Sequence, residues 1–243
     1  MISWSREGFD MTKTKQTYDY SGKGYLTVTE LNKEDSGMFT CTAYNRIGDP
    51  ATKEAKLIVV FDPKIKKTPQ YAKAAGDQGD TVELKCLAEG SPEVNFKWKK
   101  GEDEITNGGQ YEVYSKFVES NWYQGELRIM NVQKENYGQY TCRVANKNGT
   151  ITDTFAIKVD GTSIPDAPYD LQRVNSTHDS ITISWQPGFN GGLPQKYTIV
   201  VRKVRASSKT TFEIPAHYGT VYTIRGLERA TQYEIKLKSE NDH

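Results

Sequence analysis

The sequence predicts an all-β chain built as tandem β-sandwiches. Three observations lead to this prediction. Short segments that alternate apolar and polar residues recur along the whole chain, with turn residues between them. One unit of the sequence occurs twice in the same register. The length of 243 residues is also too great for one typical domain and fits two or three modules of about 100 residues each.

The internal repeat lies in the first two thirds of the chain. Residues 24–48 align with residues 125–149 without a gap. Upstream of this unit, Trp4 and Trp98 take equivalent places, each on an alternating segment that turns its indole inward. We therefore expect the first two modules to share one fold.

The second copy contains a complete pattern of core residues. Cys86 ends an alternating segment, and Trp98 follows about a dozen residues later. Tyr140 precedes Cys142 by two residues. This arrangement resembles an immunoglobulin domain, and the stretches Ala88–Pro92 and Cys142–Asn146 resemble the I-set. The resemblance implies a Cys86–Cys142 disulfide across the core, which would stabilise the module by about 4 kcal/mol. Two free cysteines that only fill the core are the alternative.

The first copy departs from this pattern. Cys41 corresponds to Cys142, but its partner should lie about twelve residues before Trp4, where the chain has only three residues. We therefore expect this module to lack its opening strands, and Cys41 to be unpaired by truncation. Phe39 replaces the tyrosine, so the hydroxyl bond of that corner must be absent. The inward side chains are then expected to have no facing sheet: Trp4, Leu26, Val28, Phe39 and Cys41.

The last part of the chain contains no cysteine. Pro165–Pro168 opens it as an extended boundary segment. Trp185 lies on the first of four alternating segments, and Leu227 precedes Tyr233 by six residues. These features resemble the core and the tyrosine corner of a fibronectin type III domain. Because the chain stops soon after the segment that starts at Tyr233, we expect the last strand to be missing.

The stretch from Trp185 to Tyr197 is similar to the fibronectin module of nephrin-like adhesion proteins. It contains Pro-Gly-Phe, Gly-Gly and Pro-Gln, with Asn190 where the family usually has aspartate. Echinoid-type adhesion proteins have a similar order of modules. The resemblance implies the membrane-proximal extracellular part of a single-pass receptor for cell-cell adhesion or recognition. It implies other immunoglobulin-superfamily cell-surface proteins as partners, bound homophilically or heterophilically through outer domains.

The predicted modules are residues 1–61 (module 1), 62–160 (module 2) and 161–243 (module 3). The connector Val59–Pro63 is short and apolar and contains proline, so it should limit swivelling. The connector Val159–Pro165 is longer and contains glycine and serine. We expect it to be the more flexible hinge.

Two asparagines begin sequons for N-glycosylation, Asn148 and Asn175. Asn148 stands before glycine between two strands, which favours a type I′ hairpin with the asparagine at its tip. Because such triplets also arise by chance, the alternative for both is an unmodified surface asparagine.

Composition and motifs weigh against other functions. Lysine plus arginine (32) nearly equals aspartate plus glutamate (31), which leaves no net field to attract nucleic acid. The three histidines, His178, His217 and His243, lack the ligand spacing of a zinc site. No nucleophile elbow accompanies them. We therefore predict no enzyme, no cofactor and no small-molecule substrate.

Two points bear on the compartment. The amino terminus has no apolar h-region and so is no secretory signal. We expect that the beginning of a secreted protein is missing here, and not that the protein is cytosolic. The alternative is an intracellular giant muscle protein of the titin or twitchin type, which also joins I-set and fibronectin modules. The intact set of Cys86, Trp98 and Cys142 and the two sequons favour the cell surface.

Overall fold

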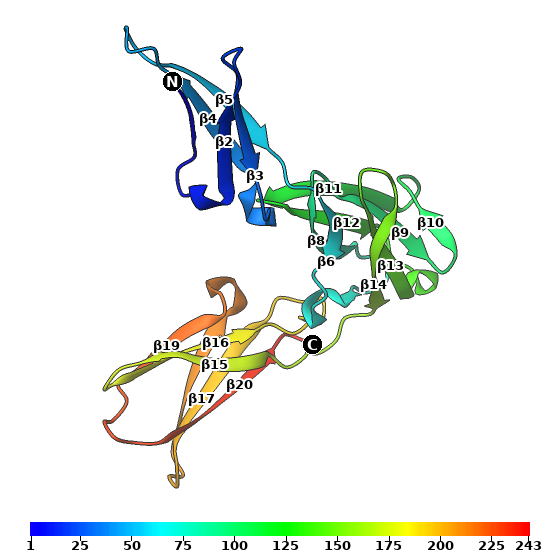
Figure 1. Cartoon of the computed structure of the whole chain (residues 1–243). Helices are drawn as coiled ribbons and strands as arrows, with labels where there is room; N and C mark the ends of the chain where they lie inside the picture. Colours follow the sequence, from blue (N-terminus) through cyan, green and yellow to red (C-terminus); the bar gives the residue numbers. More distant parts are fainter.

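The computed structural model describes all residues from Met1 to His243, and its regular elements are β-strands and short 3-10 helices. The predicted all-β class with tandem sandwiches is confirmed. Figure 1 shows the three modules as separate bodies, with modules 1 and 3 on the same side of module 2. The chain is therefore bent rather than straight. None of the helical segments has the length and apolar character of a membrane span.

Module 1 has a three-stranded and a two-stranded sheet. The first has the order β1 (Ile2–Ser5), β4 (Gly37–Ala43), β5 (Ala51–Leu57), and the second pairs β2 (Thr14–Tyr18) with β3 (Gly24–Val28). The 3-10 helices are η1 (Met11–Lys13) and η2 (Lys33–Asp35).

The core of module 1 is thin. Phe39 is its one buried apolar side chain, at 3% exposure, whereas Trp4, Leu26, Val28 and Cys41 are half-buried. We expected these side chains to have no facing sheet, and Phe39 is nevertheless buried. Its cover comes from the loop after β1, where Phe9 packs edge-on with ring centroids 5.1 Å apart.

Module 2 is the largest sandwich. One sheet has the order β10 (Asp103–Ile105), β9 (Asn95–Lys100), β13 (Gly138–Ala145), β14 (Ile151–Asp160), β7 (Lys73–Ala75). The other has the order β11 (Tyr111–Glu119), β12 (Trp122–Ile129), β8 (Val82–Ser91), β6 (Phe61–Ile65). Its 3-10 helices are η3 (Pro69–Tyr71) and η4 (Lys134–Asn136).

Alternation along the strands builds the core of module 2. On β8, Val82, Leu84 and Cys86 are buried while Glu83 and Lys85 are exposed, as expected for a sheet with one wet face. The cluster contains 17 buried residues, so this module has a closed core of its own. Phe61 pairs with Ser91 of β8 and is the first residue of β6, although we assigned it to module 1.

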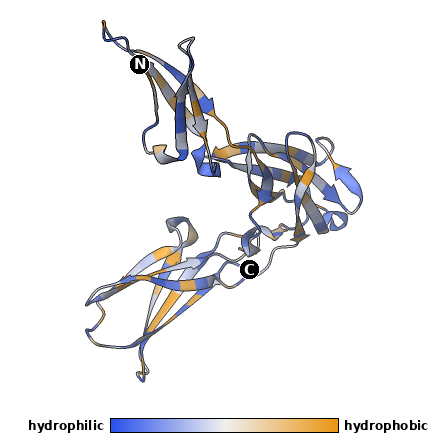
Figure 2. Cartoon of the chain, in the orientation of Figure 1, coloured by the Kyte–Doolittle hydropathy of each residue, from blue (hydrophilic) through white to orange (hydrophobic).

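Module 3 consists of two three-stranded sheets. One has the order β15 (Tyr169–Ser176), β16 (Ser180–Gln186), β19 (Val221–Arg225), and the other β18 (Lys209–Pro215), β17 (Lys196–Lys203), β20 (Tyr233–Glu240). Helix η5 (Ala216–Tyr218) lies between β18 and β19. Figure 2 shows the apolar residues of these strands. Seven of its residues form one buried cluster, which includes Trp185, Tyr197 and Ile199.

Candidate functional site

The predicted core markers of module 2 meet at one place. The structure joins Cys86 to Cys142 by a disulfide with their Cα atoms 6.4 Å apart, and Trp98 lies opposite Cys142 in the β-sheet register. The Tyr140 hydroxyl donates to the carbonyl oxygen of Asn136 at 2.8 Å. Burial raises the pKa of Tyr140 above its usual range, so this hydroxyl stays protonated and serves as a donor.

The corresponding corner of module 1 uses a different donor. Phe39 has no hydroxyl, and the Arg6 guanidinium instead donates to the carbonyl oxygens of Asp35 and Ser36, the second at 2.8 Å. The guanidinium carbon lies 5.3 Å from the centroids of both the Phe9 and Phe39 rings, within the range of a cation–π contact. Sequence reasoning missed Arg6. Its place in the repeat, equivalent to Lys100, was the available signal.

Two further groups of module 1 lie nearby. The carboxylate of Asp35 accepts from the Asn32 N–H at 2.7 Å and from Lys13 at 3.2 Å. The Asn32 bond and then the Lys13 ammonium hold the pKa of Asp35 below its usual range. Cys41 is a free thiol on β4, opposite Trp4 of β1.

The markers of module 3 also form a corner. Trp185 packs edge-on against Tyr197, with ring centroids 5.1 Å apart. The Glu228 N–H donates to the hydroxyl oxygen of Tyr233 at 2.9 Å. Leu227 is half-buried against the core, and its N–H donates to the Asp179 carbonyl oxygen at 2.8 Å.

Both sequon asparagines are exposed. Asn175 lies on β15, and Asn148 lies in the turn between β13 and β14. The predicted type I′ turn is wrong, because of the turn residues only Gly149 has a positive φ, of +81°. The Asn146 side chain explains the difference, since its oxygen accepts from the N–H groups of Asn148 and Thr150 and holds a wider loop.

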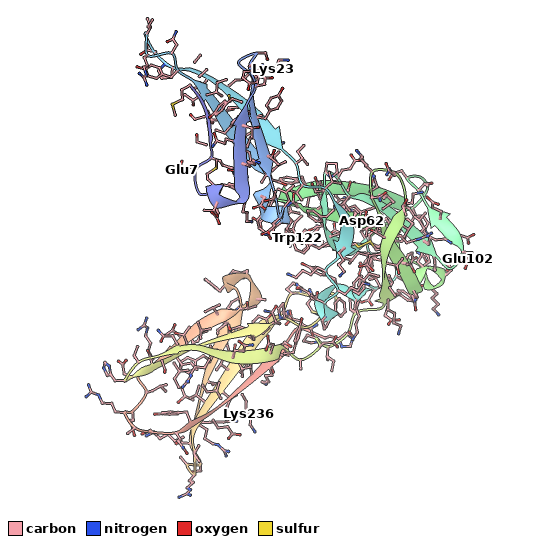
Figure 3. All side chains as sticks on the ribbon, viewed as in Figure 1. Glu7, Lys23, Asp62, Glu102, Trp122 and Lys236 are labelled. Carbon is pink, nitrogen blue, oxygen red and sulfur yellow. A yellow bond between two sulfur atoms is a disulfide. The ribbon has the colours of Figure 1, made fainter.

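The junction between modules 1 and 2 has few bonds. Lys33 of η2 contacts both carboxylate oxygens of Glu89 at 2.8 Å, and the Val59 N–H donates to the Ser36 hydroxyl oxygen at 2.9 Å. Trp122 lies at this junction (Figure 3). Exposed ion pairs of this kind contribute little stability.

The junction between modules 2 and 3 is held by two carboxylates. Asp77 accepts from the Thr162 N–H at 3.1 Å and from the Thr162 hydroxyl at 2.9 Å. These bonds, the backbone one first, lower the pKa of Asp77, so it is ionised at neutral pH. Asp166 of module 3 receives the Lys73 ammonium of module 2 at 2.7 and 2.9 Å.

The loop between β16 and β17 completes this junction. The Ser163 N–H donates to the Gly191 carbonyl oxygen at 2.9 Å. The Asn241 amide donates to the carbonyl oxygens of Ser163 and Asn190 at 2.8 and 2.9 Å. Gly192, at φ +84°, lies so close to module 2 that a Cβ there would be 2.7 Å from the Ala75 carbonyl oxygen. Only glycine fits this approach without movement.

The connector that we expected to be the more flexible one is therefore the more strongly bonded one. Its glycine and serine content predicts a flexible linker when the connector is considered alone. In the fold, Thr162 of the connector hydrogen-bonds to Asp77, and Ser163 hydrogen-bonds to Gly191 of the β16–β17 loop. The pair Gly191-Gly192 of that loop contributes to the nephrin-like resemblance in the sequence. The sequence did not predict that Gly192 would contact module 2.

The comparisons with known proteins agree with this architecture. The Immunoglobulin I-set domain family matches residues 1–59 and 63–159, and the Fibronectin type III domain family matches residues 166–243. The chain belongs to the immunoglobulin I-set family. Its last module belongs to the fibronectin type III family.

The relatives confirm the nephrin-like resemblance of this I-set chain. Human nephrin is 29% identical over 99% of the chain, which spans 20% of nephrin. Protein turtle of Drosophila melanogaster is 30% identical over 90% of the chain and 14% of its own length. The chain therefore spans a fifth or less of these relatives.

Two of the solved structures that the chain matches have TM-scores below 0.5. The titin domains A168–A170 are 23% identical, with a TM-score of 0.39 over 100% of this chain and 83% of that one. The complex of Dpr2 Ig1–Ig2 with DIP-Theta Ig1–Ig3 matches 66% of this chain and 53% of its own, at 26% identity and a TM-score of 0.49.

Proposed function

We propose that this chain is an extracellular segment of a single-pass, non-enzymatic receptor for cell-cell adhesion or recognition. Its family and its similarity to nephrin and turtle support this proposal. The partners are other immunoglobulin-superfamily proteins on cell surfaces, met homophilically or heterophilically. Sequons at Asn148 and Asn175, both exposed, fit a glycosylated surface.

Within that receptor, the segment acts mainly as a stalk that sets reach and orientation. The junction of modules 2 and 3 carries this part of the proposal. Its contacts join residues far apart in sequence, such as Asp77 and Thr162, which share two hydrogen bonds, and Gly192 and Ala75, whose backbones approach closely. A bonded junction keeps one angle between modules 2 and 3 and so fixes the orientation of the modules upstream. A free linker would allow many such angles.

A cell-aggregation assay tests the stalk role. The full receptor is expressed with this segment either intact or replaced by unrelated modules of equal length. We expect replacement to keep partner choice while changing the efficiency of aggregation. Loss of partner choice at normal surface expression would mean that these domains bind the partner themselves.

Thiol counting tests the compartment against the intracellular muscle-protein alternative. On material from the natural cells, we expect no reactive thiol at Cys86 or Cys142 in the unfolded protein before reduction, and both thiols after it. Reactive thiols at both positions before reduction would favour the reducing interior of a cell.

A further inference from the structure

A cleft of about 760 Å³ lies between modules 2 and 3. Module 2 lines it with β7, β8 and the end of η3, and module 3 lines it with the β16–β17 loop and η5. Clefts at domain interfaces are common places for ligands, and this volume is within the usual range. The bonds of Asp77 to Thr162 and the close approach of Gly192 to Ala75 connect its two walls, so a ligand would meet a preformed site.

The walls are mostly polar. The lining residues that carry hydroxyl groups include Thr81 and Tyr71 of module 2 and Thr220 of module 3. Gln195 donates its amide to the Tyr197 hydroxyl at 3.2 Å, while its carbonyl oxygen is buried without a partner. An unpaired buried acceptor is costly. For a ligand hydroxyl to pair with it, this side chain would have to turn toward the cleft and give up its bond to Tyr197.

The charges of the cleft leave one cation available. Lys73 forms an ion pair with Asp166 at 2.7 Å, and Glu83 forms one with Arg128 at 2.8 Å. Lys85 contacts Glu83 only at 3.7 Å, which is beyond hydrogen-bond distance. A ligand with many hydroxyl groups and one carboxylate would complement this set, with the carboxylate at Lys85.

We propose that the cleft between modules 2 and 3 binds an acidic oligosaccharide, with Lys85 on its carboxylate and Gln195 and the wall hydroxyls on its sugar hydroxyls. In this arrangement the ring of Tyr71, a half-buried lining residue, would pack on the C–H side of a sugar. A neutral, apolar ligand fits poorly because few of the lining residues are hydrophobic. The site needs only the fixed junction and does not depend on the stalk role.

An NMR titration of the whole chain tests this proposal, with 3′-sialyllactose as the acidic probe and lactose as the neutral one. We expect 3′-sialyllactose to shift the amide signals of Lys85, Gln195 and His217, and to bind about tenfold more tightly than lactose, as one charged hydrogen bond allows.

Lys85→Ala should remove this preference, whereas Lys66→Ala, at an exposed lysine outside the cleft, should keep it. Lys85 is exposed, so the fold of the variant can be checked in the same spectra. The proposal is overturned by equal binding of the two sugars, by shifts away from the cleft, by the absence of shifts, or by a preference that survives Lys85→Ala.

Discussion

At the scale of single residues, the two immunoglobulin modules use different donors for the equivalent corner carbonyl oxygen. The carbonyl oxygen before strand β13 accepts from the Tyr140 hydroxyl. The equivalent carbonyl of Asp35 accepts from Arg6 because Phe39 has no hydroxyl. The sequence predicted the missing hydroxyl but not its replacement, since Arg6 lies 33 positions before Phe39 and the pairing exists only in the fold.

The Arg6 corner leads to a test of module 1. Arg6→Met should lower its unfolding free energy by about 1.5–3 kcal/mol, because the Asp35 and Ser36 carbonyls lose a charged donor. Adding Phe39→Tyr should restore part of the loss, since a hydroxyl can then reach the Asp35 carbonyl. Hydrogen exchange of the β4 amides measures this. Arg46→Met, at an exposed residue, is the control; equal effects of the two methionine variants would contradict the assignment.

Glu126 gives module 2 a pH dependence. Burial, at 3% exposure, raises its pKa, but bonds from Tyr114, Lys116 and Gln124 outweigh this effect and leave the pKa below its usual range. A carboxyl whose pKa is lower in the folded state adds stability above its unfolded pKa of about 4.3, and this stability is lost as the pH falls through the folded pKa.

Urea unfolding at a series of pH values measures the Glu126 effect. We expect Glu126→Gln to destabilise module 2 at neutral pH and to reduce the loss of stability on acidification. Glu112→Gln, at an exposed residue of the neighbouring strand β11, should leave that loss unchanged. An unchanged acid profile in Glu126→Gln would refute this role.

At the scale of elements, the strands were predictable and the junctions were not. Alternation determines which side chains of β8 face the core, so Val82, Leu84 and Cys86 could be placed from the sequence alone. The contact between Asp77 and Thr162 joins residues 85 positions apart. No local pattern predicts it, because it depends on how two finished sandwiches meet.

The glycine pair of the β16–β17 loop provides the test at this scale. Gly192→Ala would bring a Cβ within 2.7 Å of the Ala75 carbonyl oxygen and should loosen module 3 from module 2. Gly226→Ala is the matched control, since it also has a positive φ, of +74°, but nothing within 4 Å. We expect faster tumbling of module 3, by ¹⁵N relaxation, only in Gly192→Ala. The same relaxation in both variants would contradict the contact.

At the scale of the whole molecule, the structure describes a bent chain with one strongly bonded junction (Figure 1). The order of the modules followed from the sequence, because the internal repeat and the Cys86, Trp98 and Cys142 spacing are local signals. The bend did not follow, since the connector composition alone indicated a hinge at Val159–Pro165. This difference matters for a receptor, because the direction of its outer domains depends on the junctions.

Residual dipolar couplings of the whole chain test the central claim, that modules 2 and 3 form one fixed unit. If the Asp77 bonds and the close approach of Gly192 hold them together, the couplings of both modules will fit one alignment tensor. Module 1, joined by fewer bonds, should show a smaller alignment of its own. Different tensors for modules 2 and 3 would show that they move independently and would contradict the account.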